Sequence, residues 1–149
     1  MIHVQSALDP LPIDVDLIER AGQAALAHES ADGGLTVVLT DDAQLRQLNR
    51  DYLGVDRPTD VLSFPASELD PDTGTAYLGD VVISVPRAEA QARVSGHPLA
   101  SEVQLLVVHG VLHLLGQDHA QAEERARMWT AQAEVLQRIG LAGIAVTES

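Results

Sequence analysis

The chain has 149 residues, a formal net charge of −13 and no cysteine, and all nine of its basic residues are arginine. This charge opposes a broad nucleic-acid-binding surface, because phosphate binding depends on cationic side chains, and the absence of cysteine excludes disulfides and thiolate zinc sites. No apolar run approaches the roughly 20 residues of a membrane span, and the first residues lack the basic start and apolar core of a signal peptide. We therefore expect one cytoplasmic domain, residues 1–149, with no membrane partner.

Hydrophobic periodicity and turn signals predict four strands and five helices. The expected elements are a strand at 2–8, a helix from 14 to about 28, a strand at 35–40, a helix capped by residues 40–42 and ending near 52, strands at 60–64 and 77–84, and helices from 86 to about 94, 99 to 115 and 121 to about 139. This order, βαβαββααα, predicts an α+β (α/β-like) single domain whose helices pack over a four-stranded mixed sheet.

The predicted helix at 99–115 is apolar on nearly every side and therefore belongs in the middle of the domain. His109 and His113 lie four residues apart, so their imidazoles share one face of the helix about 6 Å apart and can reach a common ion. Gly116 can adopt the left-handed conformation that ends a helix and turns the chain, which would bring His119 back toward the same point. Three imidazoles with a fourth position left for water are the arrangement of a catalytic zinc site.

A histidine pair at this spacing also occurs without metal, so the alternative interpretation is two ordinary core histidines. Each buried imidazole would then need a partner, at a cost of about 1 to 3 kcal/mol if it found none. Gly110 between them costs about 1 kcal/mol relative to alanine. In zinc proteases the residue after the first histidine is the general base glutamate, which Gly110 replaces, and we interpret the glycine as room for a bulky substrate such as a nucleotide backbone.

Three segments carry a resemblance to a known family. They are "HGVLHLLGQDH" (109–119), which is highly specific, "PTDVLSFP" (58–65) and "LGDVVIS" (78–84), and they lie in the expected order along the chain. Together they resemble the YbeY family, bacterial endoribonucleases that act in ribosomal RNA maturation. The first segment matches the family pattern H-G-x-L-H-L-x-G-x-D-H at every fixed position, and the similarity covers nearly the whole chain.

The resemblance implies one Zn²⁺ ion per chain, held by His109, His113 and His119, with His109 acting in catalysis through the metal. It also implies a single-strand-specific endoribonuclease that matures the 3′ end of small-subunit ribosomal RNA and works in ribosome assembly and quality control. The implied partners are ribosomal RNA and small-subunit components, with an assembly GTPase as a further candidate.

Four polar residues in these segments have two interpretations each. Asp118 could accept a hydrogen bond from a ligating imidazole and fix its tautomer, or it could be a turn or helix-cap aspartate. Thr59, Asp60 and Ser63 could be turn and strand-edge residues, or they could line the cleft that faces the metal. The resemblance favours the cleft, so we take Thr59 and Ser63 as candidate substrate contacts.

The chain departs from the family at one position. Relatives carry an arginine after the position of Tyr52 that is taken as important for RNA cleavage, whereas this chain has Leu53. Arg50 and Arg57 flank Leu53 and are candidates to supply the missing cation to the substrate. The alternative is that each is an ordinary solvated surface arginine.

Two other classes of function stay open at this point. The first is a ribosome assembly factor without enzymatic activity, in which zinc holds the fold and the acidic surface binds basic partners. The second is a zinc hydrolase that acts on another substrate. Cleavage of a defined ribosomal RNA precursor, with a metal-stripped control, separates the nuclease from both.

Overall fold

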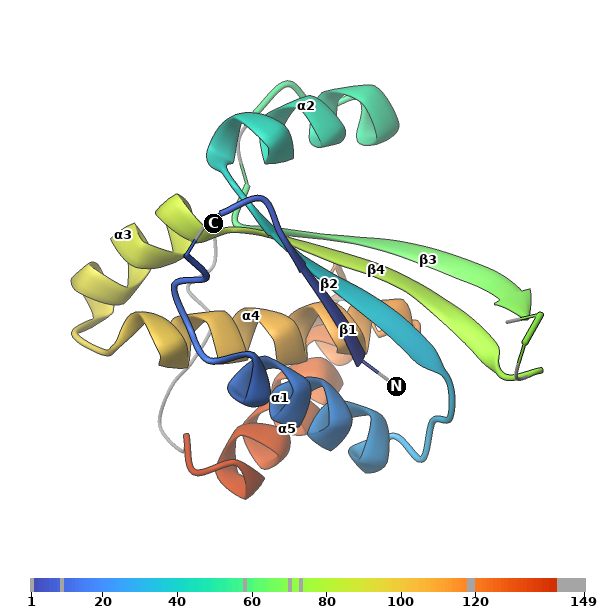
Figure 1. Ribbon diagram of the computed structural model, residues 1–149. Helices are drawn as coiled ribbons and strands as arrows, with labels where there is room; N and C mark the ends of the chain where they lie inside the picture. Colours follow the sequence, from blue (N-terminus) through green and yellow to red (C-terminus); the bar gives the residue numbers. More distant parts are fainter. Residues whose placement is uncertain are drawn as a thin grey trace.

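A computed structural model describes residues 2–8, 10–57, 59–69, 71–72, 74–117 and 120–141 of the chain. Its elements are β1 (Ile2–Ser6), α1 (Val15–His28), β2 (Gly34–Thr40), α2 (Asp42–Leu53), β3 (Val61–Leu69), β4 (Ala76–Ser84), α3 (Val85–Ser95), α4 (Leu99–Leu114) and α5 (Ala122–Arg138) (Figure 1). The predicted order of strands and helices is confirmed, and most boundaries lie within two residues of the prediction.

The described strands form a four-stranded sheet in the order β1-β2-β4-β3. β1, β2 and β4 are parallel, and β3 runs antiparallel at the edge, so the sheet is mixed as expected. α4 and α1 lie side by side against one face of the sheet with α5 packed on both of them, while α2 covers part of the opposite face (Figure 1).

β3 is longer than the sequence pattern indicates. The predicted strand ended at Phe64, yet β3 continues through Pro65 and pairs Glu68 with Tyr77 after a shift in register. Proline is tolerated here because β3 is an edge strand and the shift relaxes the ladder. Opposite Pro65, Gly79 has φ +135°, and a Cβ atom there would lie 2.2 Å from the carbonyl oxygen of Phe64.

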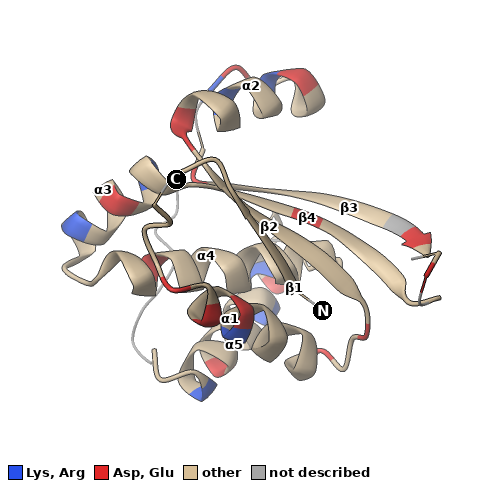
Figure 2. Cartoon of the chain, in the orientation of Figure 1, with Lys and Arg blue, Asp and Glu red and all other residues tan. Residues whose placement is uncertain are grey.

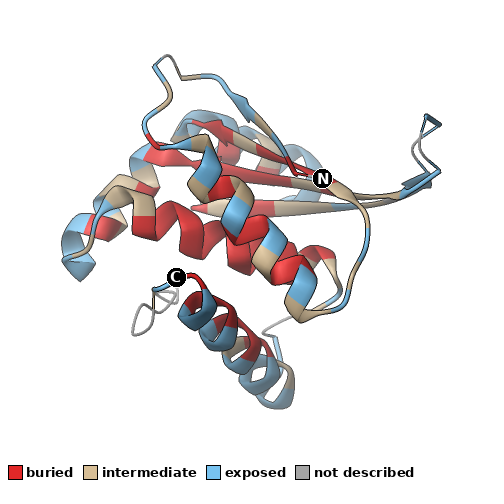
Figure 3. Cartoon of the chain, turned by 60° about the horizontal axis from the view of Figure 1, so that its bottom comes forward, coloured by how far each residue is buried: buried red, intermediate tan, exposed pale blue. Residues whose placement is uncertain are grey.

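The core of the protein is built around α4. Every residue from Ser101 to Leu112 is buried, which Figure 3 shows as a helix enclosed by its neighbours. A second, smaller cluster of Leu45, Leu62 and Val82 lies beneath α2 on the other face of the sheet. None of the described helices combines the length and the apolar composition needed to cross a membrane.

Polar groups buried with α4 have partners. Glu102, in the first turn, is 1% exposed, and its Oε1 lies 2.6 Å from Nε2 of His97. Burial raises the pKa of the Glu102 carboxyl, and the contact with His97 opposes that effect. Gln104 donates to the carbonyl oxygen of Ala100 at 3.0 Å. The first half of α4 therefore satisfies its polar side chains by contacts that residues near the start of the helix provide.

α1 and α5 are joined by a histidine with two carboxylate partners. His28 places Nδ1 2.6 Å from Glu29 and Nε2 2.7 Å from Glu134 on α5. Glu134, and then Glu29, raises the pKa of His28 above 6.5 by hydrogen bonding. Since the folded-state pKa is raised, this stabilisation is fully present below pH 6.5 and is lost as the pH rises through the raised pKa.

We expect Glu134→Gln to lower the pKa of His28, because the strongest partner of the imidazolium is neutralised. The unfolding free energy of the variant should then fall less steeply above pH 6.5 than that of the unmodified chain. NMR titration of the His28 ring and denaturant unfolding across this pH range measure both effects. Glu123→Gln, on the same helix, is the charge-matched control, and an identical His28 titration in both variants would contradict the assignment.

Candidate metal site on helix α4

His109 and His113 lie on one face of α4, as their spacing predicts. Their ring centroids are 4.8 Å apart and the ring planes meet at 73°. His109 is 6% exposed, whereas His113 is only partly buried. The pair therefore combines one ligand fixed inside the core with one that borders solvent, which suits an ion that must stay open to a substrate.

The buried imidazole is held by a residue that the sequence analysis missed. Nδ1 of His109 lies 3.0 Å from Oε1 of Gln132 on α5, and Gln132 is 4% exposed. Trp129, one turn earlier on α5, meets the same imidazole edge to face with centroids 5.9 Å apart. The sequence gives one indication of this role, because Gln132 is a polar residue on the face of α5 that otherwise carries Trp129, Ala133 and Leu136.

The third expected ligand lies outside the described residues. His119 and Asp118 both fall there, so their roles stay predictions. Across the described part of the chain, no three metal-ligating side chains come together. The expected turn is present, because Gly116 has φ +94° and donates its N–H to the carbonyl oxygen of His113 at 3.0 Å.

Gly110 faces the sheet, which corrects our interpretation of it as room for substrate. A Cβ atom at this position would lie 2.5 Å from Cγ1 of Val81 on β4 and 3.3 Å from Oγ of Ser63 on β3. The Ser63 hydroxyl also donates to the carbonyl oxygen of Gly110 at 2.9 Å. The glycine therefore lets α4 lie directly against the sheet and sets the depth of the neighbouring His109.

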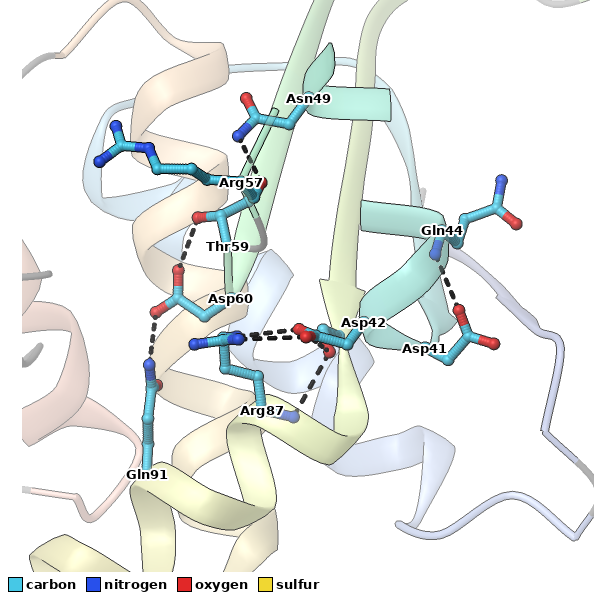
Figure 4. A network of polar contacts seen from close by, with 10 residues as sticks. Asp41, Asp42, Gln44, Asn49, Arg57, Thr59, Asp60, Arg87 and Gln91 are labelled. Atoms are coloured by element: carbon cyan, nitrogen blue, oxygen red, sulfur yellow. Dashed lines mark hydrogen bonds and ion pairs between the residues drawn. The ribbon is translucent and has the colours of Figure 1, made fainter. Parts of the chain in front are cut away.

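The two hydroxyl residues expected to contact the substrate are in different places. Ser63 is beside the histidine pair, with its proton donated to α4. Thr59 precedes β3, and its hydroxyl donates to Oδ1 of Asp60 at 3.4 Å (Figure 4). Gln91 of α3 donates to Oδ2 of the same carboxylate at 3.3 Å. Asp60 is buried, so Thr59 and Asp60 form part of the contact between α3 and the segment that leads into β3.

The two candidate arginines lie at the end of α2 and just after it, and they differ in their surroundings. Arg50 pairs with the adjacent Asp51 at 3.3 Å. Arg57 is held by its backbone, whose carbonyl oxygen accepts from Asn49 at 3.0 Å. Within the described part of the chain its guanidinium has no ion pair, and Figure 4 shows it directed away from Asp42 and the α2 N-terminus. Arg57 is therefore the better placed of the two to take a phosphate.

A groove of about 830 Å³ lies between the ends of α1 and α4 and one side of α5, but His109 and His113 do not line it. Its polar lining comes from His28, Glu29, Gln117, Glu124, Arg127, Thr130 and Glu134. The groove is therefore separate from the histidine pair, although both lie near the end of α4.

The fold and the histidine pair define a class: mixed α/β proteins with a candidate metal site on a buried helix. A sequence profile described as "Endoribonuclease YbeY" matches residues 13–140. Endoribonuclease YbeY of Brevibacillus brevis is 43% identical over 145 residues, covering 87% of this chain and 91% of the relative. That of Moorella thermoacetica is 48% identical over 133 residues, covering 83% and 85%.

A solved structure agrees with these relatives. The solution structure of a protein from Thermotoga maritima is similar with a TM-score of 0.58 and 26% sequence identity, covering 93% of this chain and 91% of that one. The profile and the relatives each span most of the chain. The chain belongs to the endoribonuclease YbeY family.

We expect Gly110→Ala to lower the free energy of unfolding by up to about 2 kcal/mol. Overpacking of the added methyl group against Val81 costs about 1 to 3 kcal/mol, and the gain in helix propensity offsets about 1 kcal/mol of this cost. Gly22→Ala on α1 is the matched control, because its Cβ would meet the side chain of Ile2, with the flexible end of that side chain nearest at 2.9 Å. Denaturant unfolding compares the two variants, and equal stability of Gly110→Ala and the unmodified chain would restore the interpretation of Gly110 as open space.

Proposed function

We propose that the chain is a Zn²⁺-dependent endoribonuclease that cleaves single-stranded RNA in the maturation of the 3′ end of small-subunit ribosomal RNA. Family membership supports the reaction. The observation that carries the site is the pair of imidazoles in edge-to-face contact on α4, one of them held by Gln132. The cell cytoplasm is the proposed location, with ribosomal small-subunit components and an assembly GTPase as partners.

The imidazole nitrogens of the candidate site suit Zn²⁺ as ligands. Imidazole nitrogens are ordinary zinc ligands, and the chain has no cysteine to compete for the ion. His109 and His113 would hold the ion with His119, and a coordination position would remain for water. When bound, Zn²⁺ lowers the pKa of a coordinated water and polarises a phosphoryl oxygen.

The residues around the pair give the site its rigidity and its shape. Gln132 fixes the orientation of the His109 ring from α5. Ser63 and Gly110 hold α4 against β3 and β4, so the distance between the imidazoles and the edge strand β3 is fixed. Burial of α4 keeps water away from one side of the pair, which strengthens the interactions of any charge bound there.

The pairing of the arginines bears on how an acidic chain would bind an RNA substrate. Four of them are paired with carboxylates, namely Arg46, Arg50, Arg87 and Arg93. Figure 2 shows that on α2 acidic residues and arginines lie side by side. Arg57 lies beyond these pairs, so it supplies local positive charge where a phosphate could bind without competing with a carboxylate.

A second candidate function rests on the net charge of −13 and on Leu53. In this alternative the chain is an assembly factor without nuclease activity, whose acidic surface binds basic ribosomal proteins. Leu53 is 59% exposed at the end of α2, where relatives carry an arginine. The two functions differ in whether purified protein cleaves RNA.

The nuclease function predicts metal-dependent cleavage. We expect one zinc per chain, loss of cleavage on chelation, and strongly reduced zinc retention in His109→Ala, His113→Ala and His119→Ala. Because the metal binds only the folded state, zinc at about 100 times its Kd should add about 2.7 kcal/mol of stability. Elemental analysis, cleavage of a ribosomal RNA precursor and thermal unfolding measure these effects, with His3→Ala as the control.

Two results would contradict different parts of this proposal. Unchanged zinc content in all three histidine variants would mean that the metal site is wrong. Zinc bound at these histidines without any cleavage would favour the assembly-factor alternative.

The arginine assignment predicts a graded effect on RNA binding. Arg57→Ala should weaken binding and reduce the salt slope by about one, because one phosphate contact is lost. Arg50→Ala should do so to a lesser degree, and Leu53→Arg should raise affinity by restoring a cation. Salt-dependent binding to one RNA fragment measures all three, with Arg138→Ala on α5 as the control. An RNA-facing role is excluded if the Arg57 and Arg50 variants behave like the control and Leu53→Arg gains nothing.

A further inference from the structure

We propose that Gln132 is a positioning residue that keeps His109 in the Nδ1–H tautomer and so presents the Nε2 lone pair of His109 to the metal. This inference rests on the proposed metal site. The two side chains come from α4 and α5, and both are buried, at 6% exposure for His109 and 4% for Gln132.

The chemistry of the contact sets the tautomer. Oε1 of Gln132 lies 3.0 Å from Nδ1 of His109, and an amide oxygen can only accept a hydrogen bond. Nδ1 must therefore carry the proton in the neutral ring, which leaves Nε2 as the unprotonated nitrogen. The opposite tautomer would place two acceptors against each other inside the core, where an unmade hydrogen bond costs about 1 to 3 kcal/mol.

The surroundings make this contact selective. Trp129 and Gln132 lie one turn apart on α5, and both contact the His109 ring. Gly110 and Ser63 fix the same turn of α4 from the sheet side. The ring therefore has one packed orientation, and a partner that could not accept from Nδ1 would leave that nitrogen without its hydrogen bond.

The partner is neutral, and this bears on the substrate. Carboxylates are the common partners of ligating histidines, and they raise the basicity of the ligand. Here an amide supplies the same hydrogen bond without adding a negative charge to a chain that already carries −13. A phosphodiester is an anion, so a neutral partner leaves more of the metal's positive charge for it. Gln132 thus gives the orientation of a carboxylate partner without its repulsion of phosphate.

Two substitutions separate these effects. Gln132→Met keeps the length and apolar packing of the side chain but removes the acceptor. We expect the metal-free protein to populate the Nε2–H tautomer of His109 and to bind Zn²⁺ about 10- to 100-fold more weakly. Gln132→Glu restores the acceptor. We expect it to regain the Nδ1–H tautomer and to bind Zn²⁺ at least as tightly as the unmodified chain, while it cleaves RNA more slowly.

The tautomer is measured by ¹⁵N NMR of the assigned His109 ring in metal-free protein, and Zn²⁺ affinity by competition with a chromophoric chelator. Gln104→Met is the matched control, because Gln104 is a buried glutamine on α4 that bonds to the backbone of its own helix. It should change neither quantity. Circular dichroism checks that each variant is folded.

An Nε2–H tautomer in the unmodified metal-free protein would overturn the proposal whether or not any variant folds. So would a Gln132→Met variant with unchanged tautomer and Zn²⁺ affinity. These readouts do not require nuclease activity, so the outcome is distinct from failure of the proposed function. If the tautomer and affinity follow the prediction but no variant cleaves RNA, the positioning role stands and the nuclease assignment falls.

Discussion

The structure depends on the burial of α4, a helix that is enclosed on every side from Ser101 to Leu112. A buried helix must provide a partner for each polar side chain that it carries, because an unmade hydrogen bond in the core destabilises the fold. Glu102 is hydrogen-bonded to His97, Gln104 to the backbone of its own helix, and His109 to Gln132. The same requirement that stabilises the fold therefore also orients the histidine of the candidate metal site.

Close packing adds a second constraint to the same helix. Gly110 has no side chain to separate α4 from β4. The hydroxyl of Ser63 donates a hydrogen bond to the carbonyl oxygen of Gly110. These two contacts fix how closely α4 packs against β3 and β4. A histidine pair carried on such a helix has little freedom to move, which is what a site that must hold an ion in fixed geometry requires.

The succession of elements could be predicted because each helix and most strands carry a local periodicity. β3 could not be bounded in this way, since Pro65 and the acidic residues after it resemble a turn while the edge position and the shift in register let the strand continue. The spacing of His109 and His113 predicts that they share one face of α4. Gly110 was misinterpreted because spacing does not say which face of a buried helix meets the sheet, and Gln132 was missed because it reaches His109 only through tertiary packing, from 23 residues away.

The contact between α4 and α5 has a consequence for the order in which the site is completed during synthesis. The chain emerges from its N-terminus, so the sheet and α4 are available before α5 can dock. Until α5 packs, Nδ1 of His109 lacks its amide partner and the indole of Trp129 is absent from the ring. A growing chain would hold the histidines in sequence but not in their final orientation. The docking of α5 is therefore the step that gives the His109 ring its final surroundings, after the sheet and α4 have been synthesised.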